Sequence, residues 1–144
     1  AIQTYDFDTF GEIFTRHKDA SDKPLFVSEY GVDRYNALTN SVDEESHAEG
    51  NRRLTVEIKE NLAALDNGSG VVVGGTLFEW NDEWWKADSR LNKSNYDDQD
   101  ASGIDIGSGP YPDKVYNEEY WGIVDIDLNL TESYYVMQEL YGSY

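Results

Sequence analysis

The segment Lys23–Gly31 places a carboxylate directly after a short apolar run. Leu25–Val27 predicts a buried strand, and Glu29 follows it after a single serine. In barrel enzymes the catalytic groups lie at the C-terminal ends of strands, because the loops there form the mouth of the pocket. Glu29 could attack the anomeric carbon of a sugar, since a retaining glycosidase combines an ionised nucleophile with a protonated acid about 5–5.5 Å away. The alternative is an exposed loop carboxylate or an ion-pair partner.

A second apolar run ends in a cluster of aromatic and polar residues. Val71–Phe78 is nearly continuous in its apolar residues, which is typical of a parallel strand covered on both faces. The candidates for sugar contacts after it are Glu79, Trp80, Asn81 and Trp84. Indole rings stack on the C–H faces of sugars, while amide and carboxylate groups bind hydroxyls. Trp80 is the nearest of them to the strand end and is the best stacking candidate; the alternative is that the tryptophans pack in the interior.

Three helices are expected around these strands. Residues 8–18 carry apolar side chains at helical spacing. Ser46 with Glu49 forms a capping-box pattern, and the apolar positions after it predict a helix as far as Leu65. A last helix begins at Thr131. The order strand, helix, strand predicts an α/β fold in which the two strands are parallel neighbours and the middle helix crosses between them.

Several segments resemble one enzyme family. Lys23–Gly31 is similar to the seventh strand of the (β/α)8 barrel in the large clan of retaining glycoside hydrolases that includes β-galactosidases, β-glucuronidases, cellulases and β-glucanosyltransferases. Gly74–Trp85 is similar to the eighth strand, and Glu118–Val124 with the final helix resembles the segment that closes such barrels. The resemblance implies that residues 1–144 are the C-terminal part of one TIM-barrel catalytic domain, comprising strands seven and eight with their helices.

The resemblance also implies roles for particular residues. Glu29 would be the nucleophile and Tyr30 would orient it, with a β-linked polysaccharide or oligosaccharide as substrate. In that clan the general acid is a glutamate at the end of the fourth strand. Only one helix is expected before the seventh-strand segment here, so no residue takes that role, and the fragment alone should be inactive. The remaining N-terminal barrel strands would be its partner.

Other interpretations stay open. Glu79, Asp82 and Glu83 could pair with Glu29, although an acid on the adjacent strand would approach the sugar from the nucleophile's side. A non-catalytic carbohydrate-binding or structural remnant of a barrel is the main alternative function. An acidic module whose tryptophan cluster binds a protein is the third.

Composition excludes several classes of function. Of 144 residues, 29 are acidic and 11 basic, and the resulting formal charge of -18 would repel nucleic acid and anionic lipid. No apolar run is long enough for a membrane span. Cysteine is absent and His17 and His47 are isolated, so we expect neither a transition-metal site nor a cofactor. An acidic cluster at Asp97, Asp98, Asp100 and Asp105 could bind calcium or simply be solvated. We expect a secreted or extracellular fragment of a longer protein.

Overall fold

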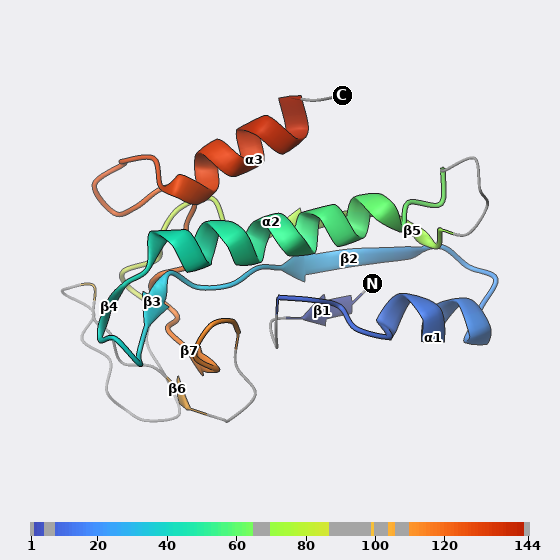
Figure 1. The fold of residues 1–144 in the computed structure, drawn as a ribbon, viewed down its shortest axis with the longest axis horizontal. Coiled ribbons are helices and arrows are strands. Elements are labelled where there is room, and N and C mark those ends of the chain that lie inside the picture. The colour runs from blue at the N-terminus through green and yellow to red at the C-terminus, as the bar shows by residue number, and fades with distance from the viewer. Residues whose placement is uncertain are drawn as a thin grey trace.

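The computed structural model describes residues 2–4, 8–64, 70–86, 99, 104–105 and 110–142. This part of the chain is a mixed α/β structure (Figure 1). Its main sheet is parallel and has the order β1-β2-β5, formed by β1 (Ile2–Thr4), β2 (Leu25–Tyr30) and β5 (Val72–Leu77). The helices are α1 (Ile13–Ala20), α2 (Glu44–Glu60) and α3 (Glu132–Gly142). Two small antiparallel pairs join β3 (Tyr35–Asn36) to β4 (Ser41–Val42), and β6 (Ile104–Asp105) to β7 (Val115–Tyr116).

The predicted strand, helix, strand unit is confirmed. Strands β2 and β5 are parallel neighbours, with Val27 opposite Gly75. Helix α2 connects them in the sequence and runs alongside the sheet (Figure 1). The helix starts earlier than expected, because the carboxylate of Asp43 accepts a 3.0 Å hydrogen bond from the backbone N–H of Ser46. Ser46 is therefore inside the helix and does not cap it. An aspartate at this place also stabilises the positive end of the helix dipole.

The predicted end of α2 at Leu65 is wrong. The helix stops at Glu60, and the carbonyl oxygen of Asn61 accepts hydrogen bonds of 2.9 Å from the N–H groups of Val71 and Val72. The residue that follows the helix is therefore hydrogen-bonded to the start of β5. Apolar spacing alone extended the helix too far, because Leu62 continues the apolar face without being helical.

The N-terminal region differs from the prediction in two ways. Strand β1 pairs in parallel with β2, so a strand as well as a helix precedes the segment likened to the seventh strand. Its three residues are too few to show a period. Helix α1 begins at Ile13 and not at Asp8, because Gly11 has φ +54° and the N–H of Phe10 donates to the carboxylate of Glu57 on α2 at 2.9 Å. Both features prevent regular helical geometry in the residues before Ile13.

A single apolar core lies between the sheet and the helices. The buried cluster combines Phe10 and Phe14, next to and within α1, with Leu54 and Ile58 of α2, and both helical regions pack against Tyr30 and other residues of the sheet. Helices α1 and α2 therefore cover the same face. The side chains at alternate positions of the strands point to the opposite face of the sheet. On that face Phe26 is 41% exposed and Val73 is 57% exposed, so among the described residues the second face of the sheet lacks a cover.

Helix α3 completes the described structure by packing on α2. The hydroxyl of Thr131 accepts a 3.4 Å hydrogen bond from the N–H of Tyr134, which confirms the predicted helix start. The side-chain amide of Asn51 on α2 donates to the hydroxyl of Ser133 at 3.0 Å, and Met137 is buried. This contact holds the last helix against the crossover helix of the sheet.

Candidate functional site

Glu29 lines a cavity of about 350 Å³ at the C-terminal ends of two adjacent parallel strands. Glu29 is the penultimate residue of β2, and Phe78 follows the last residue of β5. The other lining residues are Lys86, Tyr116, Glu118 and Trp121. The cavity has a volume in the range of small-molecule sites and combines carboxylates, a cation and aromatic rings.

Gly31 explains why Phe78 reaches Glu29. The N–H of Phe78 donates to the carbonyl of Tyr30 at 2.8 Å, which continues the pairing of β2 with β5 beyond the last residue of β5. A Cβ atom on Gly31 would lie 2.3 Å from the carbonyl oxygen of Phe78. Only a glycine allows so close an approach of the two backbones. The glycine in the Glu-Tyr-Gly sequence therefore brings the aromatic ring of Phe78 into the cavity that Glu29 lines.

Lys86 joins three parts of the cavity wall. Its Nζ lies 4.4 Å from the centre of the Phe78 ring, 3.0 Å from the Glu83 carboxylate and 3.4 Å from the Glu118 carboxylate. Burial lowers the pKa of Lys86, but the hydrogen bond to Glu83 and the charge of Glu118 outweigh that effect and hold the pKa above its usual value. Lys86 is therefore a permanent cation that stacks on an aromatic face.

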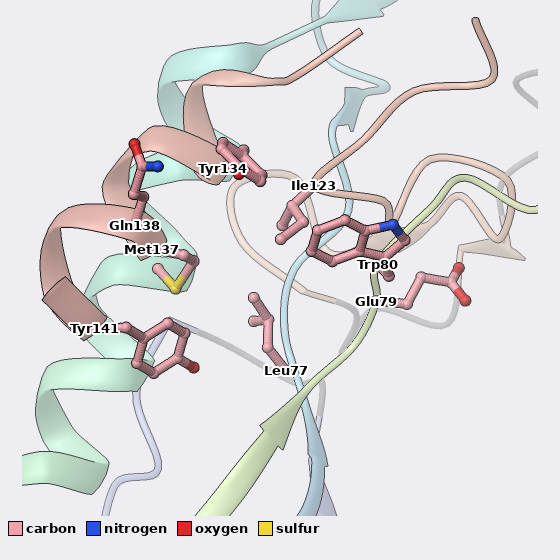
Figure 2. A pocket seen from close by; sticks show the side chains of 8 residues that line it. All are labelled: Leu77, Glu79, Trp80, Ile123, Tyr134, Met137, Gln138 and Tyr141. Atoms are coloured by element: carbon pink, nitrogen blue, oxygen red, sulfur yellow. The ribbon is translucent and has the colours of Figure 1, made fainter. Parts of the chain in front are cut away.

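Trp80 lies in a different pocket. An apolar groove of about 340 Å³ lies between the end of β5 and α3. Figure 2 shows the residues that line it: Leu77, Glu79, Trp80, Ile123, Tyr134, Met137, Gln138 and Tyr141. Trp80 is 65% exposed and makes an edge-to-face contact with Tyr134. The rings that share a cavity with Glu29 are those of Phe78, Tyr116 and Trp121. The structure thus separates Trp80, the predicted stacking residue, from the predicted nucleophile.

Glu79 turns its carboxylate away from the apolar part of that groove, past the Trp80 ring (Figure 2). Burial and then the neighbouring Glu83 carboxylate raise the pKa of Glu79 to about 8, against the opposing effect of Lys86. Glu79 is therefore protonated at neutral pH. Like Trp80, it does not line the Glu29 cavity.

The other predicted contact residues also lie elsewhere. Tyr30 is buried in the core, where its hydroxyl is 2.9 Å from that of Thr55 on α2, so it belongs to the packing of the sheet against the helix. With 1% exposure the Tyr30 side chain offers almost no surface to a substrate, and its role in orienting Glu29 stays a prediction. The side-chain amide of Asn81 donates to the backbone of Asp82 at 2.8 Å, and Trp84 packs edge to face on Trp85. None of these side chains lines the cavity of Glu29.

A buried ion pair holds the segments around the cavity together. The guanidinium of Arg34, just after β2, contacts the Asp82 carboxylate at 2.5 Å and that of Glu44 at 3.1 Å. Asp82 also accepts a 2.7 Å hydrogen bond from the N–H of Gly122. Burial raises the pKa of Asp82, and Arg34 opposes the rise. Asp82 is therefore a structural carboxylate, engaged away from Glu29, and Glu83 is engaged with Lys86.

Sequence reasoning missed four cavity residues: Lys86, Tyr116, Glu118 and Trp121. The first three lie in residues 86–118, a segment rich in Asp, Asn, Ser, Gly and Pro, whose composition does not distinguish a site from a solvated loop. Trp121 lies in the segment likened to the closing part of a barrel, and its 2% exposure is typical of a packed residue. The one available signal was the aromatic and acidic sequence Glu118–Trp121.

The predicted absence of a metal site is tested only in part. Within the described residues, no group of three or more histidine or acidic side chains is placed to hold a metal ion. His47 is fully buried, which lowers its pKa to about 3 and keeps it neutral. The side chains of the Asp97–Asp105 cluster lie outside the described residues. No helix in the described ranges has the length and apolar character needed to cross a membrane.

Comparisons with known proteins add no assignment. No protein-family model matches the chain, and a search of curated proteins gives no significant match.

Proposed function

We propose that the chain is the C-terminal part of the (β/α)8 barrel of a retaining glycoside hydrolase or transglycosylase that acts on β-linked glycans. Glu29 attacks the anomeric carbon as the glycosidic bond breaks, and the aglycone leaves with a proton from the general acid. Water or the hydroxyl of another sugar then attacks the glycosyl ester and releases the Glu29 carboxylate. The general acid belongs to a part of the barrel outside these residues. The observation that carries the proposal is the cavity in which Glu29 and the Phe78 ring lie together at the C-terminal ends of neighbouring parallel strands.

The sheet supports a larger barrel around this chain. Parallel strands are almost always covered on both faces, yet in the part of the chain that the structure describes the helices pack on one face. Phe26 and Val73 are exposed on the other face. In a closed barrel that face points inward and the edges of the sheet are paired. We therefore propose that the remaining N-terminal strands cover it, and we call the protein that contains them the full-length protein. Its secretion is part of the same proposal.

The proposal is tested by trapping the covalent intermediate. The full-length protein is incubated with a panel of activated 2-deoxy-2-fluoro-β-glycosides of glucose, galactose and mannose, and the labelled peptide is identified by mass spectrometry. A label on Glu29 supports the assignment. A label on another carboxylate would reject Glu29. Retained glycan binding without any label would favour the non-catalytic remnant.

We expect Phe78→Ala to weaken substrate binding and turnover more than Trp80→Ala. Phe78 shares the cavity with Glu29, whereas Trp80 lies in the separate groove beside α3. Loss of one aromatic face should raise KM by about tenfold, on the scale of a ring contact worth roughly 1 kcal/mol or more. Steady-state kinetics of the two variants, each with its melting temperature, checks this. A larger increase in KM for Trp80→Ala than for Phe78→Ala would indicate that Trp80 stacks on the sugar.

We expect the 144-residue chain to be unstable as an isolated monomer. Among the described residues, this parallel sheet ends at β1 on one side and β5 on the other, and its apolar face includes the exposed Phe26 and Val73. Such surfaces promote association. Light scattering in low and high salt should show aggregation, or recovery of a defined complex when the remaining barrel segment is supplied. A monomer that unfolds cooperatively would mean that the chain is a self-contained domain.

A further inference from the structure

A cation and a carboxylate lie side by side on the wall of the Glu29 cavity. The Lys86 side chain is 32% exposed and that of Glu118 is 30% exposed, so both polar groups are accessible but restrained. Their closest atoms are 3.4 Å apart, which is longer than a strong charge-assisted hydrogen bond. Both groups therefore keep capacity for another partner. An ammonium offers three N–H donors, and a carboxylate accepts at two oxygens.

The aromatic ring beneath this pair adds a second kind of contact. Lys86 Nζ lies 4.4 Å from the centre of the Phe78 ring, and Phe78 lines the same cavity. A sugar ring presents C–H groups on its faces and hydroxyls at its edge. The C–H groups of the sugar can contact the part of the Phe78 side chain that lines the cavity, while one hydroxyl donates to a carboxylate and its neighbour accepts from an ammonium. The arrangement matches an uncharged sugar with adjacent hydroxyl groups.

The charges in the cavity disfavour an anionic sugar. Glu29 and Glu118 both line it, and Lys86 is already paired with Glu83 at 3.0 Å as well as with Glu118. A substrate carboxylate would add a further negative charge and would have to compete with both protein carboxylates for one ammonium. Like charges in a partly desolvated cavity repel strongly. The formal charge of -18 on the chain acts in the same direction.

We propose that Lys86 and Glu118 together bind adjacent hydroxyls of a neutral sugar unit in the Glu29 cavity and exclude sugars that carry a carboxylate on that unit. This inference deepens the proposed function and depends on it for the identity of the ligand. It gives Glu118 a binding role that differs from the nucleophilic role of Glu29. Glu83, which pairs with Lys86 at 3.0 Å, helps to hold the Lys86 ammonium in place.

The test measures sugar binding and does not require turnover. Dissociation constants of the full-length protein are measured by ligand-observed NMR at fixed ionic strength. The ligands are the methyl β-glycosides of glucose, galactose and mannose and the corresponding methyl uronides. The neutral glycoside that binds best should bind at least about tenfold more tightly than its uronide. Lys86→Met and Glu118→Gln should each weaken the neutral glycoside by about tenfold, as expected for a lost charge-assisted hydrogen bond.

The two variants should differ in their response to charge. Glu118→Gln removes a negative charge and should reduce the discrimination against the uronide, whereas Lys86→Met should increase it. Lys86→Arg keeps the ion pair and should retain most of the affinity. Glu12→Gln, which alters an exposed pair on α1, is the matched control and should change neither value.

Two results would overturn the inference. A uronide that binds more tightly than its neutral counterpart, with the preference lost in Lys86→Met, would make Lys86 an anion receptor. Unchanged affinities in Lys86→Met and Glu118→Gln would make the pair purely structural. Labelling of Glu29 by the fluorosugar is a separate readout, so either result can be told apart from failure of the proposed function.

Discussion

Glu29→Gln in the full-length protein is expected to remove nearly all turnover and to leave the fold intact. The amide is close in shape to the carboxylate but cannot form the glycosyl ester. Losing a covalent catalyst costs several orders of magnitude in rate, so initial rates on an aryl β-glycoside should fall at least about a thousandfold. The melting temperature should change little, because Glu29 lines a cavity and is not part of the buried cluster.

A chemical rescue sharpens this test. Glu29→Gly leaves space for azide, which should attack the anomeric carbon of an aryl β-glycoside and give the α-glycosyl azide as the phenol leaves. The inverted product, identified by NMR, would show that the missing carboxylate had occupied the nucleophile's side. Glu12→Gln, which changes an exposed carboxylate just before α1, should keep full activity. Residual activity of Glu29→Gln above about one-hundredth of wild type would reject Glu29 as nucleophile.

Arg34→Met is expected to be the most destabilising of the substitutions considered. Arg34 is 5% exposed and pairs with Asp82, which is 0% exposed. Removing one partner of a buried ion pair leaves an uncompensated charge and typically costs about 3–5 kcal/mol in the free energy of unfolding. Asp82 also accepts a hydrogen bond from the N–H of Gly122. The segment Glu118–Gly122, which contributes two side chains to the cavity wall, should therefore become less ordered as well. Urea denaturation of the full-length protein should show the loss as a lower midpoint.

Two further variants show whether the buried charge is the cause. Arg53→Met removes an arginine that is 47% exposed and pairs with Glu49 on the surface of α2, and it should cost less than about 1 kcal/mol. The double variant Arg34→Met with Asp82→Leu removes both charges and should regain part of the loss. If Arg34→Met and Arg53→Met are equally mild, the buried pair does not determine stability.

Much of the fold follows from local patterns in the sequence. The apolar runs at Leu25–Val27 and Val71–Phe78 predicted two strands, and the amphipathic segment between them predicted the crossover helix. Periodicity is strong over such lengths because burial of one face selects the side chains. It failed where another contact decided the geometry. The positive φ of Gly11 makes α1 begin later in the sequence than expected, and the hydrogen bonds from Val71 and Val72 to Asn61 end α2.

The candidate site divides in the same way. The position of Glu29 after an apolar strand is a one-dimensional pattern, and the structure places Glu29 in a cavity at that strand end. The order of residues does not show which aromatic side chains share the cavity with Glu29. Phe78 and Trp80 are two positions apart, and backbone geometry at the end of β5 sends them to different pockets.

The sequence by itself determined the α/β class, the parallel pairing of its two longer strands and the strand-end position of Glu29, because each depends on local periodicity and on chain order. Tertiary structure alone decided which distant groups meet. The close approach of Gly31 to Phe78 brings the aromatic ring beside Glu29. The ion pair of Lys86 with Glu118 joins residues 32 positions apart. Contacts of this kind depend on how whole elements pack, and no local propensity encodes them.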